Sequence, residues 1–197
     1  MLKPPRPYRL RRMRLSDISS VMDIERDAFP VPWNESAYHY EVAENPLASY
    51  EVLTVGLAGL PAKIIGYAGF WMLVDEAHIS TIAVDTDWRS HGLGGLLLIS
   101  LLVEAYKLDA SLATLEVRKS NIIAQALYHD FSFITVGGRR RYYQGREDAI
   151  IMSIDPLDKS YRTYLHRKEK ALYQRFNEEV LTPNGTAARG RDETEQS

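Results

Sequence analysis

The chain has 197 residues, of which 45% are hydrophobic, and it carries a formal net charge of −2 at pH 7. This length and apolar share predict one domain with additional terminal segments, and the small net charge argues against general electrostatic binding to nucleic acid or membranes. Because the chain has no cysteine, it has no disulfide, no thiol nucleophile and no cysteine-bound metal.

Three further features exclude other classes of protein. The five histidines are scattered and form no H-x-x-x-H pair, so we expect no catalytic zinc and no bound metal. The N-terminus has prolines and basic residues but no apolar segment, so we expect no signal peptide. The most apolar helical segment is shorter than the roughly 20 residues that cross a bilayer, and it contains Glu104. These features predict a cytoplasmic protein with no membrane contact.

The N-terminal region is predicted to form one strand and two helices. Residues 8–14 form the strand, which has an exposed basic face that is either solvated or in contact with an acidic partner. Ser16-Asp17 stands where the N-cap of the first helix belongs, and Pro30 and Pro32 end that helix. Asn34 caps the second helix.

A meander of three strands follows, and its last strand leads into a glycine-rich turn. The strands are expected at residues 49–56, 62–73 and 76–84, with a hairpin at 59–61. The turn is Arg89-Ser90-His91-Gly92-Leu93-Gly94, and an almost continuously apolar helix continues from it. Glycines permit close approach to the free N–H groups at the start of a helix, where the dipole favours an anion. The turn therefore predicts a phosphate site; the alternative is a plain turn before a core helix.

A charged residue interrupts the next predicted strand, residues 111–118. The residues of a strand in a sheet covered on both faces are expected to be apolar, and Glu116 is not. Burial of a lone carboxylate costs several kcal/mol, so Glu116 either has a partner or faces a cleft. The expected partner is Arg118, two residues further along on the same face. The strand alone does not decide between these alternatives.

The rest of the chain is predicted to complete the sheet and to add helices. Ser120-Asn121 caps a helix at 122–131, in which Tyr128 lies beside the apolar face. A hairpin with a turn at Gln144-Gly145 and a last strand at 149–154 follow. The apolar face of the helix is expected to comprise Ile123, Ala126, Leu127 and Phe131.

Together these elements predict an α/β fold with a mixed, mostly antiparallel sheet flanked by helices and a C-terminal helical extension. The domain is expected at residues 1–156, the extension at 157–181 and a disordered tail, poor in apolar residues, at 182–197. The extension either packs on the domain, which we favour, or binds a partner. Its apolar face is expected to comprise Tyr161, Leu165, Leu172, Phe176 and Val180.

These motifs resemble those of the GCN5-related N-acetyltransferases (the GNAT family), which bind acetyl-coenzyme A. The turn lacks the Lys-Ser or Lys-Thr of a Walker loop and the G-x-G-x-x-G of a dinucleotide site, whereas it fits R-x-x-G-x-G, the pyrophosphate loop of this family. The closer resemblance is to the ribosomal-protein-alanine N-acetyltransferases (RimI type). It is carried by Leu115-Glu116-Val117-Arg118 with Ser120-Asn121, by Ala126-Leu127-Tyr128, by residues 141–152, and upstream by Ile24-Glu25, Phe29 and Pro32-Trp33.

The resemblance implies a GNAT fold and direct transfer of an acetyl group from acetyl-coenzyme A to an amine. Glu116 would remove a proton from the substrate's α-amine, directly or through water, and Tyr128 would protonate the departing thiolate. These roles agree with the chemistry, because an amine must lose its proton before it attacks a thioester and a thiolate leaving group needs an acid. The alternative for Tyr128 is a half-buried helix tyrosine.

The resemblance also implies contacts with acetyl-coenzyme A and with the substrate. The backbone of residues 82–84, which are Ile82, Ala83 and Val84, would pair with the pantetheine arm, and one N–H would polarise the thioester carbonyl. Asn121 would bind the cofactor from the other side. The substrate would contact Pro32, Trp33 and Tyr142. The pyrophosphate would be held by Arg89, Ser90, His91, Gly92, Leu93, Gly94 and Gly95.

The sequence departs from the family pattern in three places. His91 stands where Gln or Arg is common, with little expected effect because the backbone binds the phosphate. Ser132 replaces a glycine that normally ends the helix in a left-handed conformation, which puts the turn to Phe133 in question. The hairpin loop between Tyr143 and Gly145 is short, and because this hairpin frames the peptide in the family, it leaves the substrate preference open.

The resemblance implies N-α-acetylation of a protein N-terminus, with the N-terminal alanine of small-subunit ribosomal protein 18 as the family substrate and no direct contact with nucleic acid. Two alternatives remain: the same chemistry on a small amine or a lysine side chain, and a module that binds coenzyme A without catalysis. The presence of both Glu116 and Tyr128 argues against the non-catalytic module.

Overall fold

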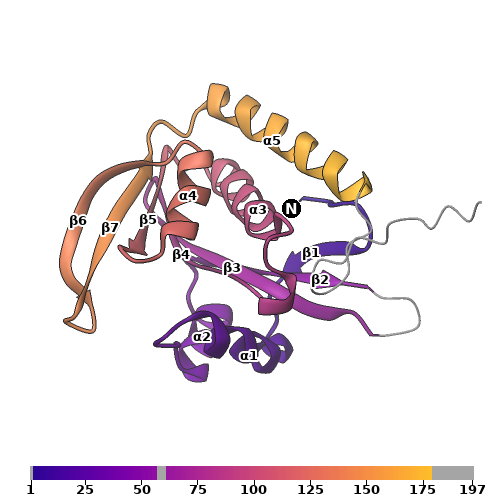
Figure 1. Ribbon diagram of the computed structural model, residues 1–197, viewed down its shortest axis with the longest axis horizontal. Helices are drawn as coiled ribbons and strands as arrows, with labels where there is room; N and C mark the ends of the chain where they lie inside the picture. The colour runs from indigo at the N-terminus through magenta and orange to yellow at the C-terminus, as the bar shows by residue number, and fades with distance from the viewer. Residues whose placement is uncertain (1, 57–60, 179–197) are drawn as a thin grey trace, which may run out of the picture.

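The computed structural model describes residues 2–56 and 61–178, which form a seven-stranded sheet with helices on both faces (Figure 1). The strands are β1 (Tyr8–Arg12), β2 (Ala48–Val55), β3 (Lys63–Leu73), β4 (Glu76–Val84), β5 (Leu112–Arg118), β6 (Ile134–Tyr143) and β7 (Glu147–Ile154). Their order in the sheet is β1-β2-β3-β4-β5-β7-β6. All neighbours are antiparallel except β4 and β5, which are parallel. This confirms the predicted mixed, mostly antiparallel sheet.

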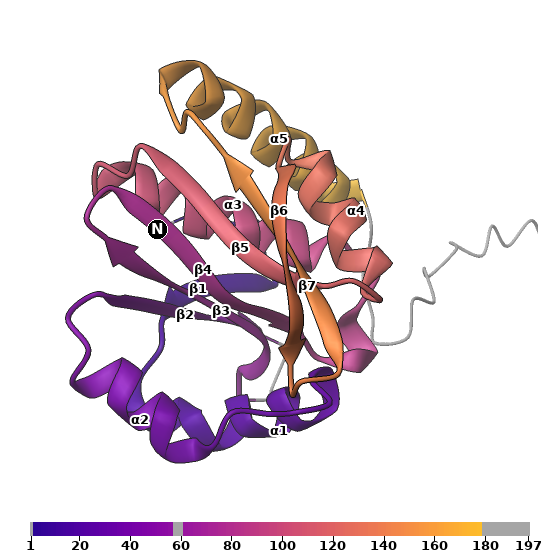
Figure 2. The ribbon, with the colours of Figure 1, turned by 90° about the vertical axis from the view of Figure 1, so that its left-hand side faces the viewer.

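Helices cover both faces of the sheet. The helices α1 (Ile18–Ala28) and α2 (Glu35–Ala43) lie on one face, and α3 (Leu93–Lys107), α4 (Ile122–Asp130) and α5 (Lys159–Glu178) lie on the other (Figures 1 and 2). Short 3-10 helices at Leu15–Asp17 and Thr86–Trp88 come just before α1 and the glycine turn. Over the described ranges, no helix has both the length and the apolar character to span a membrane.

The helix α3 is apolar around its whole circumference because it lies between two layers. Its inner side packs on β3 and β4, and its outer side is covered by α5 (Figure 1). Leu96, Leu97 and Leu98 are consecutive and all fully buried, which a helix on the surface of a protein does not permit. The position of α3 therefore explains the leucine-rich sequence after the glycine turn.

All three predicted caps include the residue at the N-cap position, but only Asn34 and Asn121 make a capping hydrogen bond. Asn34 Oδ1 accepts a hydrogen bond from the N–H of Ala37 at 2.8 Å, which caps α2. Asn121 Oδ1 accepts one from the N–H of Ala124 at 3.1 Å, which caps α4. Asp17 does not cap α1, because its carboxylate instead accepts from the N–H of Arg14 at 2.8 Å and is bound by Arg11.

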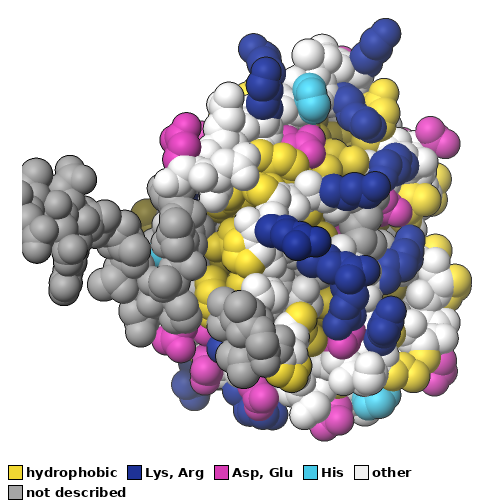
Figure 3. All heavy atoms as spheres, turned by 90° about the vertical axis from the view of Figure 1, so that its right-hand side faces the viewer, with side chains coloured by type: hydrophobic (Ala, Val, Ile, Leu, Met, Phe, Trp, Pro, Cys, Tyr) yellow, Lys and Arg dark blue, Asp and Glu magenta, His cyan; other side chains and the backbone are white. Residues whose placement is uncertain are grey.

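The arginines of β1 point to both faces of the sheet rather than to the single basic face predicted, and Arg11 and Arg12 form ion pairs within the chain. The Arg11 guanidinium holds the pKa of Asp17 below its usual value, through a hydrogen bond of 2.5 Å from Arg11 Nη1 to Asp17 Oδ2. Arg12 Nη2 lies 3.4 Å from Glu104 Oε1 of α3. Figure 3 shows basic side chains gathered on this side of the molecule, with acidic side chains among them. An acidic partner is therefore not needed to balance this strand.

The predicted apolar face of α4 is wrong by about one residue. Ile123 is 87% exposed and Ala126 is also exposed. The residues that face the core have the spacing i, i+3, i+4 and i+7, which is one side of a helix. This shift places Tyr128 inside the fold rather than beside the apolar face. The inward residues are Ala124, Leu127, Tyr128 and Phe131.

The turn after α4 keeps the shape that a glycine would give it. Ser132 takes the left-handed conformation with φ 65°. The N–H of Phe133 donates to the carbonyl of Tyr128 at 3.0 Å, which closes the end of the helix. The serine therefore carries the strain that the family glycine avoids, and the expected change in this turn is not observed.

The C-terminal helix packs on the domain, as favoured from the sequence. Tyr161 and Leu165 are buried, and the Tyr161 hydroxyl donates to the carbonyl of Phe131 at 2.6 Å. Lys168 Nζ lies 2.6 Å from Asp130 Oδ1. Phe176 packs against Tyr8, with 5.1 Å between ring centroids. Val180, the tail at 182–197 and residues 59–60 of the predicted hairpin lie outside the described residues, and the predicted division into domain, extension and tail stays a prediction.

Leu165→Ala is expected to lower the free energy of unfolding by about 2–5 kcal/mol, because it leaves a cavity under α5. The measurement is urea unfolding of the full chain. Lys170→Ala, on the exposed side of the same helix, is the matched control and is expected to change stability by less than about 0.5 kcal/mol. Equal effects of the two substitutions would mean that α5 does not pack on the domain.

Candidate active site

The sheet opens between its two parallel strands. The pairing of β4 with β5 runs from Glu76 opposite Leu112 to Ile79 opposite Leu115 and stops there. On its other side β4 stays paired with β3 as far as Val84. In the described part of the chain, one edge of β4 from residue 80 to residue 84 therefore has no strand beside it. Backbone groups on that edge point into the gap between the two strands.

A cleft of about 660 Å³ occupies this gap. Its walls come from β4, β5 and α4, from the α1–α2 connection, and from the β6–β7 hairpin. Figure 2 shows this hairpin reaching across the end of the sheet toward the α1–α2 connection. The cleft brings together seven of the residues singled out from the sequence: Pro32, Trp33, Ile82, Glu116, Asn121, Tyr128 and Tyr142.

Other predicted residues lie outside the cleft lining. Ala83 and Val84 belong to β4 beyond it, and the glycine turn at 89–95 follows β4 at the start of α3. Arg89 Nε donates to the carbonyl of Val84 at 3.1 Å, which ties the turn to the end of the strand. His91 is buried. The turn therefore lies next to the open edge of β4 without forming part of the cleft wall.

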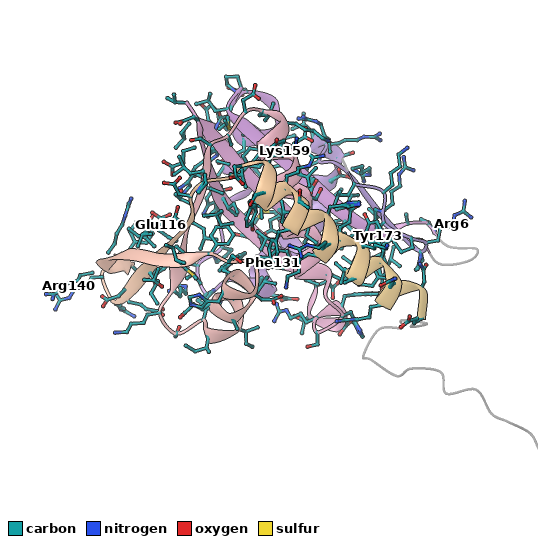
Figure 4. The ribbon with its side chains drawn as sticks, turned by 90° about the horizontal axis from the view of Figure 1, so that it is seen from above. Arg6, Glu116, Phe131, Arg140, Lys159 and Tyr173 are labelled. Atoms are coloured by element: carbon teal, nitrogen blue, oxygen red, sulfur yellow. The ribbon has the colours of Figure 1, made fainter. Side chains whose placement is uncertain are left out.

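Glu116 projects from β5, and its side chain is only 8% exposed. Its Oε2 lies 3.0 Å from Nε2 of His78, and its Oε1 lies 3.2 Å from Nη2 of Arg139. The expected partner Arg118 instead binds Glu147 at 2.8 Å. Figure 4 shows Glu116 near the root of the β6–β7 hairpin, whereas Arg140 projects away from the molecule. The two alternatives for Glu116 are thus both realised, because it has partners and also lines a cleft.

Two tyrosines stand near this carboxylate. Tyr128 packs on Phe133, with 5.7 Å between ring centroids, and burial raises the pKa of its hydroxyl, so that it keeps its proton at neutral pH. The Tyr143 hydroxyl donates to the backbone carbonyl of Glu116 at 3.2 Å, and burial raises its pKa to about 12. The Arg118 guanidinium lies over the Tyr143 ring, 4.0 Å from its centroid. Both hydroxyls are therefore protonated under physiological conditions.

A buried carboxylate holds the α1–α2 connection in place. Glu25 Oε1 accepts from the N–H of Trp33 at 2.8 Å. Its Oε2 accepts from the hydroxyl of Tyr38 at 3.0 Å and from that of Tyr67. Burial raises the pKa of both hydroxyls above its usual value, so they remain donors. Three donors from separate elements thus fix the cleft wall that contains Pro32 and Trp33.

The glycine turn is shaped by strained backbone and by α5. Ser90 and Gly92 have φ 67° and 79°, in the left-handed region. A Cβ on Gly92 would lie 2.8 Å from Cδ1 of Leu172 and 3.2 Å from Nη2 of Arg175. Position 92 therefore favours glycine for its conformation, and a Cβ there would also displace the ends of the Leu172 and Arg175 side chains.

The sequence analysis missed several side chains at the cleft. Trp71 stacks between Trp33 and His78, at centroid distances of 6.0 Å and 5.7 Å. His78, Trp71 and Arg139 were not assigned to the site. The sequence does show that His78 is a polar residue between two apolar residues of a strand. It does not show which residue lies beside His78 in the sheet. The described ranges contain no group of three acidic or histidine side chains that could hold a metal ion.

Three features together are typical of an acetyltransferase. They are the opening between two parallel strands, the carboxylate in that opening, and the glycine turn before a buried helix. The model of the acetyltransferase (GNAT) family matches residues 18–133. The chain belongs to this family, which is a family of acyltransferases.

Particular relatives narrow the class. A Bacillus subtilis (strain 168) protein, provisionally named a ribosomal protein bS18-alanine N-acetyltransferase, is 38% identical over 144 residues, 73% of this chain and 92% of that relative. The crystal structure of the ribosomal-protein-S18-alanine N-acetyltransferase from Escherichia coli superposes with TM-score 0.66 at 33% identity, covering 76% of this chain and 94% of that one. The resemblance to RimI-type enzymes is thereby confirmed.

A more distant structure shares the fold. Arabidopsis thaliana NAA60 in complex with acetyl-CoA superposes with TM-score 0.66 at 18% identity, covering 75% of this chain and 98% of that one. At this identity the likeness concerns the fold alone. It supports the mixed, mostly antiparallel sheet flanked by helices that the resemblance predicted.

Gly92→Ala is expected to lower the free energy of unfolding by about 2–4 kcal/mol, from backbone strain and the clash with Leu172. Gly145→Ala is the matched control, because Gly145 also has φ 68° but a Cβ there meets nothing within 4 Å. Its expected cost is about 1–2 kcal/mol, from the backbone alone. Chemical denaturation of both variants measures the difference, and equal losses would show that α5 does not press on the turn.

Proposed function

We propose that the chain transfers the acetyl group of acetyl-CoA to the N-terminal amine of a protein, with the N-terminal alanine of ribosomal protein bS18 as the substrate. The observation that carries this proposal is the cleft that joins Glu116 and Tyr128 at the opening of β4 from β5. It is supported by relatives named for this activity, which match over more than nine-tenths of their own length. A cytoplasmic location, with no direct nucleic-acid or membrane contact, stays a prediction.

The residues present fit acetyl-CoA. The free edge of β4 offers the backbone groups of the alternate residues between 80 and 84 that do not face β3 to an extended amide-containing arm. The glycine turn, residues 89–95, offers the N–H groups at the start of α3 to a pyrophosphate. Asn121 lines the opposite wall of the cleft. Acetyl-CoA supplies an activated acetyl thioester, and the chain itself supplies proton transfer and positioning.

Glu116 acts as the base in this proposal, and Tyr128 as the acid. The amine nitrogen bonds to the acetyl carbon while Glu116 takes its proton, directly or through water. The carbon–sulfur bond breaks, and Tyr128 delivers its proton to the sulfur. The raised pKa of Tyr128 keeps that proton in place until a thiolate forms. No enzyme nucleophile is needed, which agrees with a chain that has no cysteine.

The cleft favours a peptide over a polyamine. A polycation requires several available carboxylates, whereas Glu25 and Glu116 are the acidic side chains in the described lining. Glu25 is bound by three donors, and Glu116 is bound by His78 and Arg139. The walls that remain, at Pro32, Trp33 and Tyr142, are apolar or aromatic and suit the first residues of a chain.

The first test is an acetyl-CoA assay against peptides that differ at the first residue, with spermidine and a lysine peptide whose N-terminus is blocked. We expect the bS18 N-terminal peptide, which begins with alanine, to be acetylated at its α-amine, as read by mass spectrometry. Turnover of spermidine or of the lysine side chain alone would refute the proposal. Binding of acetyl-CoA without acetylation of any of these amines would point to the non-catalytic module.

The second test addresses the proton transfers. Glu116→Gln and Tyr128→Phe are each expected to lower kcat by about 10²–10⁴-fold, the usual contribution of a positioned acid or base. The affinity for acetyl-CoA, measured by calorimetry, is expected to stay nearly unchanged because neither side chain holds the phosphates. Glu44→Gln, an exposed carboxylate outside the cleft, is the control. A fully active Glu116→Gln enzyme would show that the base is another group.

A further inference from the structure

A chain of polar side chains leads from Glu116 to the surface across β4 and β5. His78 of β4 lies opposite Thr114 of β5 in the parallel register. His78 Nε2 is 3.0 Å from Glu116 Oε2, and His78 Nδ1 is 3.0 Å from Thr114 Oγ1. The Thr114 hydroxyl also hydrogen-bonds Oε1 of Glu76. Side-chain exposure rises along this chain, from 8% at Glu116 through 19% at His78 to 35% at Glu76.

The number of hydrogens available to these side chains shows that one contact is incomplete. The three contacts, Glu116–His78, His78–Thr114 and Thr114–Glu76, each need one hydrogen between two acceptor atoms. The Thr114 hydroxyl supplies one hydrogen and a neutral imidazole supplies a second, but two ionised carboxylates supply none. One contact therefore lacks a hydrogen until a proton is added. A proton gained at the Glu116 end satisfies all three contacts at once.

We propose that His78, Thr114 and Glu76 form a relay that carries the proton taken by Glu116 from the substrate amine to solvent. This inference rests on the proposed function of Glu116. A proton moves from Oε2 of Glu116 to Nε2 of His78, another from Nδ1 to Oγ1 of Thr114, and the hydroxyl proton of Thr114 to Oε1 of Glu76. Three bonds to hydrogen break and three form, and Glu76 then releases its proton to water. The imidazole is left as its Nε2–H tautomer, and it returns to the Nδ1–H tautomer by exchange of protons with water before the next turnover.

The imidazole is held in the orientation that this relay requires. The ring of His78 stacks on Trp71 with 5.7 Å between centroids and 6° between planes. Trp71 is fixed in turn by Glu41, whose Oε2 accepts from Trp71 Nε1 at 2.7 Å. The ring plane therefore points one nitrogen at Glu116 and the other at Thr114. The other charged group that faces Glu116 is Arg139 of β6, which approaches Oε1 and leaves Oε2 to His78.

The relay gives the site a way to reset between turnovers. Glu116 is almost enclosed, and a protonated Glu116 cannot accept a proton from the next amine. Exchange of that proton through the occupied cleft would compete with product release. A path along the face of β4 and β5 removes it instead through Thr114 and Glu76, which do not line the cleft.

The decisive experiment compares Thr114→Val with Thr114→Ser in the full-length enzyme. Valine keeps the shape of threonine but breaks the chain of hydrogens, whereas serine keeps the hydroxyl. We expect Thr114→Val to lower kcat by about 10- to 100-fold, less than the loss expected for Glu116→Gln, with KM for acetyl-CoA unchanged. Thr114→Ser is expected to recover most of that loss. Thermal unfolding of both variants separates a kinetic defect from a folding defect.

The outcomes separate the relay from the function on which it rests. If the wild-type enzyme acetylates the peptide and Thr114→Val turns over as fast as Thr114→Ser, the relay is refuted while the proposed function stands. A loss that appears in KM rather than kcat, or one that serine does not recover, assigns Thr114 a structural role and also refutes the relay. A wild-type enzyme that acetylates no peptide overturns the proposed function, and the relay with it.

His78→Phe tests the relay at the residue next to Glu116. Phenylalanine keeps an aromatic ring to stack on Trp71 but has neither nitrogen. We expect kcat to fall at least as far as in Thr114→Val, because the link next to Glu116 is lost. An active His78→Phe enzyme would overturn the relay even if Thr114→Val were impaired.

Discussion

The parting of β4 from β5 is the constraint on which the rest of the molecule depends. Two parallel strands that pair over only four residues each, Glu76–Ile79 and Leu112–Leu115, leave one edge of the remainder of each strand without the hydrogen bonds that a sheet normally provides. Unpaired buried backbone groups are costly, and they are tolerated where water or a ligand can satisfy them. The opening therefore creates both a place for an extended ligand and a reason for the fold to bind one.

The two faces of the sheet hold the opening in different ways. On one face, α3 and α4 pack as apolar helices, and Asn121 and the glycine turn mark where each helix begins. On the other face, an apolar cluster under α1 and α2 lies beside polar contacts, in which Glu25 accepts hydrogen bonds from the N–H of Trp33 and from two tyrosine hydroxyls. Apolar packing holds the wall that begins with Asn121 and the glycine turn, whereas directional hydrogen bonds hold the wall that contains Pro32 and Trp33. A wall held by a few directional bonds is easier to reshape by substitution than a packed core, which suits the part of the site that selects the substrate.

The sequence predicted most of the fold because its strands and helices have clear periodicity and clear breakers. The order of elements, the glycine turn, the caps at Asn34 and Asn121 and the placement of the C-terminal helix followed from local patterns. Glu116 was found because a charge in an apolar strand has a cost that can be reasoned about without knowing the neighbours. The same local patterns also carried the resemblance to the acetyltransferases.

The errors share one physical cause, which is that side-chain partners in a sheet are distant in sequence. Arg118 is near Glu116 in the chain, yet Glu147 of the neighbouring strand binds Arg118, and His78 and Arg139 of other strands bind Glu116. The inward face of α4 depends on how the helix lies over the core, which propensity does not encode. His78 was counted only as a scattered histidine, because nothing local places it opposite Thr114, 36 residues away.

The contact of α5 with Gly92 links the glycine turn, which lies inside the region matched by the family model, to a helix that lies outside it. Leu172 and Arg175 lie against the turn, so local opening of the C-terminal helix and loosening of the turn are one event rather than two. Hydrogen exchange in the turn is therefore governed by the lifetime of a helix that begins after the last strand. The flexibility of the segment that we propose binds phosphate is therefore expected to depend on α5.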